Sequence, residues 1–335
     1  MTEPRVAITF VSDAVPGIRR RRRGKRFVYL TPTGRELNGD VAKRIDALAI
    51  PPAWTDVWIC ADECGHIQAT GRDARGRKQY RYHAQFRQGR ERAKFKNLIP
   101  FGEALGALRA RIDTDLRAPA LTHDRVVAGV VSLIGETFLR VGNEAYARTN
   151  KTFGITTLRS NHVDVSGTHL HLQFVGKGGK EFDVDCCAPR VARLVRRLQD
   201  LPGQRLFQYL DDDGEVRAIS SHDVNEYLRE ATGVDATAKT FRTWGASLLA
   251  AQELVLLDPP QSETEARREI NAALRPVANA LGNTLAVCKA SYVHPTVLKR
   301  YEDGSLAQRW NAGPKRAANH LNAGERRLLC ILRGS

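Results

Sequence analysis

The chain has no long apolar segment. None of its 335 residues belongs to a run approaching the roughly 20 consecutive apolar residues of a membrane-spanning helix. The N-terminal stretch also lacks the apolar core of a secretion signal. Six cysteines in a chain of this length do not indicate a disulfide framework. We therefore expect a soluble, cytoplasmic protein that does not act at a membrane.

Two common kinds of chemical site are also missing. The sequence contains no Gly-x-x-x-x-Gly-Lys loop for nucleotide phosphates and no carboxylate cluster spaced for a metal ion. Cys60, Cys64 and His66 are close in sequence, but a structural zinc needs four ligands and no second pair follows at a suitable interval. Asp211 opens an acidic turn, yet the twelfth position of a calcium loop starting there is His222. We predict no metal and no nucleotide or other cofactor.

Acidic residues are scarce relative to basic ones. The chain has 37 Asp and Glu against 52 Lys and Arg, which gives a net charge of +15. This balance indicates a polyanionic partner, with nucleic acid ahead of an anionic membrane. Hydrophobic residues make up 42% of the chain, enough to form folded cores, and its length suits two domains.

The first part of the chain differs in pattern from the remainder. Its short β-prone runs, separated by Pro, Gly and Asp, are residues 27–30, 57–60 and 66–69. Helices are predicted at 40–48 and from near 79 toward 96, after which the pattern becomes mostly helical. The sequence therefore predicts an α+β protein, with a small N-terminal β-sheet domain over residues 1–97 and a larger, mostly α-helical domain over residues 98–335.

A small antiparallel sheet is predicted inside the helical domain. Its short alternating segments are residues 155–158, 162–165, 170–174 and 182–185. Gly167 and the glycine-rich turn at 176–180 separate them. The surrounding helices are predicted at 125–138, 189–198, 223–231, 238–257 and 263–281.

Basic residues are concentrated in two N-terminal segments. The five arginines at 19–23 are interpreted as a solvated loop or arm that attracts phosphates, with a nuclear address as the alternative. Between residues 71 and 96, basic residues alternate with Gln79, Tyr80 and Tyr82. Basic side chains hold phosphates, while Gln and Tyr can reach base edges or sugar oxygens. A basic amphipathic helix that reads no bases is the alternative for this second segment.

Five short motifs follow one another in the second domain. They are Leu139-Arg140-Val141-Gly142, Phe174-Val175-Gly176-Lys177, Lys239-Thr240-Phe241-Arg242-Thr243-Trp244, Leu281-Gly282-Asn283-Thr284 and Ala290-Ser291-Tyr292-Val293-His294-Pro295. Arginine forks suit the two non-bridging oxygens of a phosphodiester, and a lysine can protonate a leaving oxygen. A tyrosine with a reference pKa near 10 needs a positive environment to act as a nucleophile. Together these residue types suit phosphoryl transfer to a phenolic oxygen without a metal.

The order and spacing of these motifs resemble the type IB DNA topoisomerases, especially the small viral and bacterial ones. The resemblance covers about residues 27 to 301. It implies a helical catalytic domain in which the nucleophile is Tyr292 and the proton donor is Lys177, with Lys180 as the fallback donor. The catalytic residues implied are Arg140, Lys177, Arg242, Asn283 and Tyr292.

The same resemblance implies DNA contacts in both domains. Residues 76–83, Gly-Arg-Lys-Gln-Tyr-Arg-Tyr-His, are similar to a segment that lies in the DNA major groove in small type IB topoisomerases. The contacts implied there are Lys78, Gln79, Tyr80 and Tyr82. In the second domain, Tyr146 and Lys239 match phosphate-contacting residues of the family.

Asn283 is where this chain departs from the family pattern. Viral and eukaryotic relatives usually have histidine nine positions before the nucleophile. An asparagine amide can donate a hydrogen bond to a non-bridging oxygen, but it carries no charge and shuttles no proton. We therefore expect an orienting role in the transition state. Capping of a helix that starts at Thr284 is an alternative, and both roles can coexist.

By this resemblance, the protein relaxes supercoiled duplex DNA through transient cleavage of one strand, a 3′-phosphotyrosyl intermediate and religation. Exchange of one phosphodiester for another needs neither ATP nor metal. We expect a monomer that clamps DNA, associated with the nucleoid if the source is bacterial. A tyrosine recombinase shares the nucleophile and arginines, and a non-enzymatic basic DNA-binding protein is the alternative from another class. The segment 76–83 and the Gly-Lys hairpin favour the topoisomerase.

Overall fold

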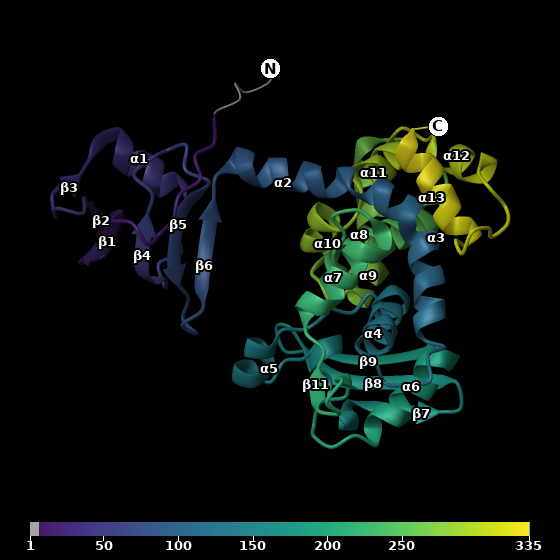
Figure 1. The fold of residues 1–335 in the computed structure, drawn as a ribbon. Helices are drawn as coiled ribbons and strands as arrows, with labels where there is room; N and C mark the ends of the chain where they lie inside the picture. The colour runs from purple at the N-terminus through teal and green to yellow at the C-terminus, as the bar shows by residue number, and fades with distance from the viewer. Residues whose placement is uncertain (1–6, 335) are drawn as a thin grey trace. The chain divides into compact units, whose positions relative to one another are not determined.

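A computed structural model describes residues 7–334, and the chain divides into two compact units, Met1–Ala93 and Lys94–Ser335 (Figure 1). The domain boundary predicted from the sequence, between residues 97 and 98, lies just after the end of helix α2 (Ala84–Lys96). Within residues 7–334, no helix is both long and apolar enough to cross a membrane.

The N-terminal unit is built on one antiparallel sheet with strand order β3-β2-β1-β4-β5-β6. The strands are β1 (Ile18–Arg23), β2 (Arg26–Leu30), β3 (Glu36–Leu37), β4 (Thr55–Ile59), β5 (Ile67–Arg72) and β6 (Lys78–Tyr82). Helix α1 (Gly39–Ala47) contributes Ile45 to a small core with Ile18, Tyr29, Ile59 and Ala69. The predicted strands near 27–30, 57–60 and 66–69 and the helix at 40–48 are confirmed.

The arginine run at 19–23 was expected to be a loop or arm, and this expectation is wrong. It forms β1, which pairs with β2 along its length and with β4 at its start. Arg20 shows how the charge is accommodated. Its guanidinium donates to the carbonyl oxygens of Ile50 and Pro51 and lies 4.2 Å from the centre of the Phe27 ring. The hairpin with β2 and the pairing with β4 override the local pattern of charge.

The helix expected to start near residue 79 begins later. Residues 78–82 form β6, which pairs with β5, and α2 starts at Ala84. A hairpin turn sets this register: Asp73 Oδ1 accepts from the backbone nitrogens of Arg75 and Arg77, and Gly76 has a φ of 73°. Because strand side chains alternate between faces, Tyr80 and Tyr82 lie on the same face of the sheet.

The second unit is mostly helical. Its helices are α3 (Leu98–Asp115), α4 (His123–Thr137), α5 (Glu144–Asn150), α6 (Pro189–Gln199), α7 (Ser221–Thr232), α8 (Ala238–Leu254), α9 (Glu263–Ala280), α10 (Leu285–Ser291), α11 (Pro295–Glu302), α12 (Leu306–Ala312) and α13 (Ala323–Arg333). Helix α8 is the centre of the core, where Trp244 is fully buried and packs edge-on against Phe101 of α3. Gly102 lies so close to this indole that a Cβ there would be 2.4 Å from it.

A three-stranded antiparallel sheet, ordered β7-β8-β9, lies within this unit. Its strands are β7 (Val163–Ser166), β8 (His169–Gly176) and β9 (Lys180–Cys187), and a separate hairpin pairs β10 (Gln208–Leu210) with β11 (Val216–Ala218). The strand predicted at 155–158 is instead a 3-10 turn, Ile155–Thr157. Its backbone nitrogens bond to the carbonyls of Arg140 and Val141, which keeps it out of the sheet. The predicted α+β class is confirmed.

Candidate active site

Six of the predicted functional residues line one pocket of about 270 Å³ in the second unit. These six residues are Arg140, Tyr146, Lys177, Lys239, Arg242 and Tyr292. They come from the loop after α4, from α5, from the β8–β9 turn, from α8 and from the end of α10. The pocket therefore gathers four cations and two tyrosines from segments distant in sequence.

Arg242 is the most enclosed of the cations, with only 3% of its surface exposed. Its guanidinium donates to the carbonyl oxygen of Phe138, which caps α4 in a left-handed conformation, and to that of Leu281 at 2.6 Å. Burial lowers the pKa of Arg242 to about 10. Both acceptors are neutral, so they orient the fork and leave its positive charge uncompensated.

Arg140 is held in the loop that follows α4. Its backbone carbonyl accepts from Ile155 N at 2.9 Å, and a Cβ on Gly154 would lie 2.5 Å from the same oxygen. Its Nη2 donates to Asn283 Oδ1 at 2.5 Å, and Nη1 and Nη2 approach the Gly282 carbonyl at 3.5 and 3.4 Å. Burial lowers the pKa of this guanidinium as well. The side chains of Arg140 and Asn283 are therefore held together as a hydrogen-bonded pair.

Asn283 is buried, with 8% exposure, and its side-chain oxygen is committed to Arg140. Its amide nitrogen Nδ2 is buried and has no hydrogen-bond partner among residues 7–334. The capping alternative is wrong, because α10 begins at Leu285 and Thr284 is the N-cap. The Thr284 hydroxyl accepts from Val287 N at 3.3 Å. A buried donor left over in this way can bind water or an oxygen atom of a ligand.

Tyr292 directly follows the last residue of α10, and its backbone nitrogen bonds to Cys288 O. Its ring centre lies 5.2 Å from the Arg242 guanidinium carbon and 5.9 Å from Lys239 Nζ. Burial raises the pKa of the phenol, but Arg242, Lys239 and Arg140 outweigh it, and the pKa is lowered below its usual value. The site therefore favours the phenolate, which is the nucleophilic form.

The β8–β9 turn carries the two candidate proton donors. Lys177 is exposed and lines the pocket, next to Gly178 and Gly179, whose φ angles of 81° and 76° let the chain reverse. Lys180 Nζ instead donates to the backbone carbonyl of Asn283 at 3.3 Å. Lys180 is thus bound to the asparagine segment, whereas Lys177 borders the pocket.

Tyr146 and Lys239 border the same pocket. Tyr146 lies in α5, whose N-cap Asn143 accepts from its backbone nitrogen, and 43% of its surface is exposed. Lys239 lies in the first turn of α8. Among residues 7–334, no carboxylate forms a salt bridge with the two arginines or the two lysines of the pocket.

The other predicted DNA contacts lie on β6 in the N-terminal unit. Tyr80 and Tyr82 are stacked, with ring centres 5.8 Å apart and planes inclined by 10°, and each is 41% exposed. Lys78 forms a salt bridge with Asp13 at 2.5 Å. Gln79 donates to Asp73 Oδ2 at 2.9 Å. The two tyrosines are open to a ligand, whereas Lys78 and Gln79 have partners within the unit.

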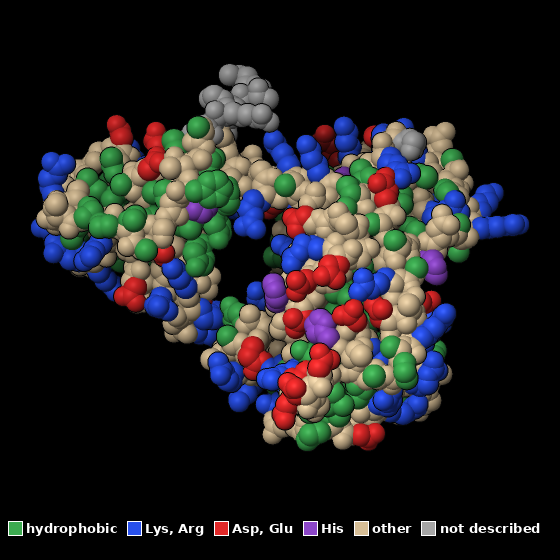
Figure 2. Space-filling view, in the orientation of Figure 1, with side chains coloured by type: hydrophobic (Ala, Val, Ile, Leu, Met, Phe, Trp, Pro, Cys, Tyr) green, Lys and Arg blue, Asp and Glu red, His purple; other side chains and the backbone are tan. Residues whose placement is uncertain are grey.

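The row of rings extends beyond the predicted segment. Phe86 of α2 lies 5.8 Å from Tyr82, and Phe10 lies 5.8 Å from Phe86 and 4.7 Å from the His66 ring. Phe10 is 77% exposed, which is unusual for so large an apolar side chain. Lys and Arg side chains are prominent on the visible face of both units (Figure 2). No local sequence pattern marks Phe10, because its ring partners His66 and Phe86 are distant in sequence.

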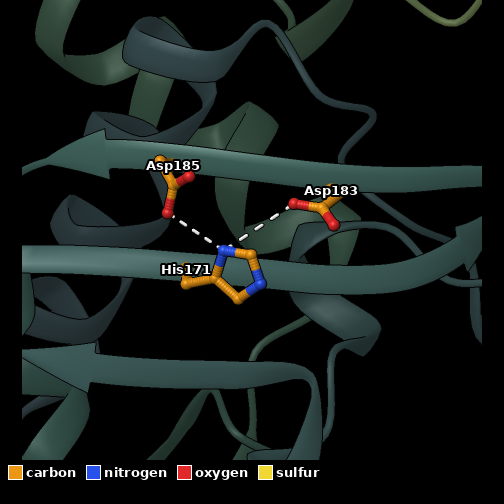
Figure 3. A group of neighbouring side chains, drawn as sticks. All are labelled: His171, Asp183 and Asp185. Carbon is orange, nitrogen blue, oxygen red and sulfur yellow. Dashed lines mark hydrogen bonds and ion pairs between the residues drawn. The ribbon is translucent and has the colours of Figure 1, made fainter.

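One cluster of metal-ligand type lies on the small sheet, outside the pocket (Figure 3). His171 Nδ1 is 2.9 Å from Asp185 and 3.7 Å from Asp183, and the pKa of the imidazole is raised, mainly by the hydrogen bond to Asp185. All three side chains are at least partly exposed. Because both carboxylates face the same ring nitrogen, the arrangement is that of a cross-strand ion pair.

Comparisons with known proteins agree with this geometry. Residues 83–315 match the catalytic core of eukaryotic DNA topoisomerase I, and residues 26–73 match the N-terminal domain of bacterial DNA topoisomerase IB. A DNA topoisomerase 1B of Acanthamoeba polyphaga mimivirus is 36% identical over 295 residues, which is 86% of this chain and 88% of the relative.

Two more distant relatives extend the comparison. The DNA topoisomerase 1B of Vaccinia virus (strain Copenhagen) is 22% identical over 236 residues, 70% of this chain and 72% of the viral protein. A DNA topoisomerase 1 of Mycosarcoma maydis is 26% identical over 253 residues, which is 66% of this chain but 24% of the fungal protein. Both the catalytic-core match and the viral relatives extend across most of this chain.

Proposed function

Because the chain belongs to the type IB DNA topoisomerase family, we propose that Tyr292 is the nucleophile with which it cleaves and rejoins one strand of supercoiled duplex DNA. The observation that carries this assignment is the position of the phenol beside the Arg242 guanidinium, in a pocket of four cations. That environment lowers the pKa of the phenol and favours attack on phosphorus.

Three other tyrosines have the opposite environment. The hydroxyls of Tyr29, Tyr227 and Tyr301 each bond to a carboxylate, from Asp46, Asp115 and Glu269 respectively. Burial and these carboxylates raise the pKa of each phenol, that of Tyr29 to about 12. A tyrosine that is hydrogen-bonded to a carboxylate does not readily form the phenolate, and the negative charge beside it repels a phosphate.

The reaction can be followed atom by atom. The Tyr292 phenol loses its proton to solvent, and its oxygen forms a bond to phosphorus while the bond from phosphorus to the 5′-oxygen breaks. Lys177 supplies a proton to that leaving 5′-oxygen. The products are a 3′-phosphotyrosyl bond and a free 5′-hydroxyl. After strand rotation the 5′-hydroxyl attacks the same phosphorus and the tyrosine leaves.

Arg140, Arg242 and Asn283 stabilise the charge that develops in this step. In the proposed complex, the two guanidinium groups and the Asn283 amide donate to the non-bridging oxygens. Their side chains are already oriented by carbonyl acceptors and by each other before DNA binds. Donors that need no reorientation contribute most to catalysis of this kind.

DNA is the partner of this family. We further propose that the chain binds duplex DNA as a monomer, through Tyr146 and Lys239 in one unit and Tyr80 and Tyr82 in the other. The net charge of +15 supports a polyanionic partner. We also propose that neither nucleotide nor metal takes part, and that the protein works in the cytoplasm, on the nucleoid if its source is bacterial.

Plasmid relaxation in EDTA without nucleotide tests the reaction. The wild type is expected to relax the plasmid, Tyr292→Phe to be inactive, and Tyr209→Phe, outside the pocket, to match the wild type. A suicide substrate should trap a covalent adduct in the wild type but not in Tyr292→Phe. Adduct formation by Tyr292→Phe would overturn the assignment. Exchange between two duplexes without relaxation would instead favour a tyrosine recombinase.

A further inference from the structure

The last turn of α2 contacts the chain on both sides of Tyr292. Lys94 Nζ donates to the backbone carbonyl of Ser291 at 2.6 Å, immediately before the tyrosine. The Phe95 ring lies 5.2 Å from the His294 imidazole, two residues after it, in an edge-on arrangement of 71°. Neither contact belongs to the pocket that binds phosphate in the proposed reaction.

The Lys94 contact satisfies a specific need of α10. Ser291 is the last residue of this short helix, so its carbonyl has no partner within the helix. A cation at a helix C-terminus is also favoured by the helix dipole. The lysine stem is steadied as well, because Nζ lies 4.1 Å from the centre of the Phe95 ring.

Phe95 is the attachment point of an otherwise solvated helix. Among the 13 residues of α2, all of which the structure describes, only Phe95 is buried. Its partner His294 is itself largely enclosed, and burial lowers the pKa of that imidazole to about 4. The ring is therefore neutral near pH 7, and its Nδ1 accepts from Thr296 N at 3.1 Å.

A second element holds the same segment from α8. Ser247 Oγ accepts from His294 N at 2.9 Å and donates toward Tyr292 O at 3.3 Å. The segment from Ser291 to His294 is thus contacted by three side chains, Lys94 and Phe95 from α2 and Ser247 from α8. Without the two contacts from α2, the carbonyl at the end of α10 loses the Lys94 donor and the His294 ring loses its packing against Phe95.

We propose that Lys94 and Phe95 are positioning residues for Tyr292, holding the main chain on either side of it so that the phenol stays beside Arg242 and Lys239. The inference rests on the proposed role of Tyr292 as nucleophile. Displacing a reacting group by about 1 Å can cost about 100-fold in rate, so modest loosening of this segment affects the chemistry.

The competing explanation for Lys94 is an ordinary phosphate contact. A phosphate contact acts on DNA affinity, and its effect is strongest at low salt. A positioning residue acts on the rate at saturating DNA. It slows cleavage and religation by the same factor, because both steps use the same phenol oxygen. The fraction of covalent complex at equilibrium then stays unchanged.

The test uses Lys94→Met, which removes the donor and keeps most of the stem, with Lys96→Met as its control. Lys96 lies in the same turn and is exposed. Single-turnover cleavage of a suicide substrate, religation rate and DNA affinity are measured for each. We expect cleavage and religation by Lys94→Met to be about 10- to 100-fold slower at saturating DNA, with affinity within about twofold, and Lys96→Met to match the wild type.

Two further readouts exclude a general loss of structure. Lys94→Arg keeps a donor and should restore most of the cleavage rate. The pH–rate profile for cleavage should shift to higher pH in Lys94→Met, because the phenol moves away from the cations that favour its ionised form. Phe95→Leu, a milder change than truncation, should show the same shift while remaining folded by thermal melting.

The outcomes separate this inference from the proposed function. Wild-type cleavage by both Lys94→Met and Phe95→Leu at saturating DNA, with Tyr292→Phe inactive, overturns the positioning role and leaves the nucleophile in place. A loss of affinity alone in Lys94→Met identifies a phosphate contact and also overturns it. Adduct formation by Tyr292→Phe would overturn the role of Tyr292 as nucleophile, and with it the positioning role of Lys94 and Phe95.

Discussion

Arg140 donates a hydrogen bond to the side-chain oxygen of Asn283 at 2.5 Å, and this bond determines which end of the amide remains available. With Oδ1 committed, the buried Nδ2 is a donor without a partner within residues 7–334. An unpaired buried donor costs free energy in the absence of a ligand. A non-bridging phosphate oxygen would satisfy it, which is why we assign Asn283 to transition-state binding.

The cleavage rate of variants at Asn283 should therefore depend more on the charge of the new side chain than on its size. Asn283→Ala removes one donor and should slow cleavage about 100-fold, as loss of a single oxyanion donor does. Asn283→Asp should be slower still, because a carboxylate would neutralise Arg140 and repel the phosphate. Single-turnover cleavage at saturating DNA measures both. An Asp variant as fast as the Ala variant would contradict direct contact between this side chain and the phosphate.

The cleavage rate should increase with pH, and this increase should occur at a lower pH than for a tyrosine with an ordinary pKa. The pKa of Tyr292 is lowered below its usual value by the neighbouring cations, so the reactive phenolate forms earlier as pH increases. Lys239→Met removes one of these cations and should move the rise to higher pH. Rate profiles of the two proteins at saturating DNA make the comparison. Coincident profiles would show that Lys239 does not influence the phenol.

Stability should fall in acid partly because of His294. Its pKa in the folded protein is about 4, below the ordinary value of 6.5, so the unfolded chain takes up this proton first. The stabilisation is complete above about pH 6.5 and is lost as the pH falls through 4. His294→Gln should flatten the melting temperature over that window relative to the wild type. Parallel curves for the two proteins would place the acid sensitivity elsewhere.

Phe10 should contribute to DNA affinity without contributing to stability. Its side chain is 77% exposed at the end of the aromatic row on the N-terminal unit. Partial burial of such a ring on binding is worth about 1 kcal/mol, or roughly fivefold in Kd. Leu256→Ala is a matched control, because Leu256 is 80% exposed in the other unit. Equal affinity of Phe10→Ala and wild type would remove Phe10 from the interface.

Gly102→Ala should destabilise the catalytic unit. A Cβ at this position would lie 2.4 Å from the Trp244 ring in the core, and overpacking of this kind typically costs about 1–3 kcal/mol. Gly89→Ala is the control, since a Cβ there meets no atom within 4 Å and alanine favours a helix. Chemical denaturation should separate the two variants. A neutral Gly102→Ala would mean that the core around Trp244 adjusts freely.

Sequence reasoning was strongest where local pattern and motif order agree. The hairpin at 176–180 and the helix carrying Arg242 were predicted close to their observed bounds, because turn glycines and helical periodicity are local signals. The strand at 19–23 was missed because its side chains are all charged, although β2, with which it forms a hairpin, follows it directly in the chain. The start of α2 was placed too early because residues 78–82 are held as a strand by β5.

Within the site, the residues proposed to carry the chemistry could be identified from the sequence, whereas the residues that contact them could not. Tyr292 stands in an ordered series of motifs, so its place could be inferred. Lys94 and Ser247 have no motif of their own. Each acts through a bond to the backbone of a residue far along the chain, and a contact with a main-chain carbonyl or amide leaves no trace in the partner's side chain.

The neutral acceptors around Arg242 have a consequence for the DNA-free enzyme. Two arginines and two lysines share one pocket, and no carboxylate pairs with them among residues 7–334. Their mutual repulsion persists until an anion enters, and in the proposed reaction the scissile phosphate is that counter-ion as well as the substrate. The protein is thus built to be more stable with its substrate bound, and its melting temperature should report occupancy of the pocket.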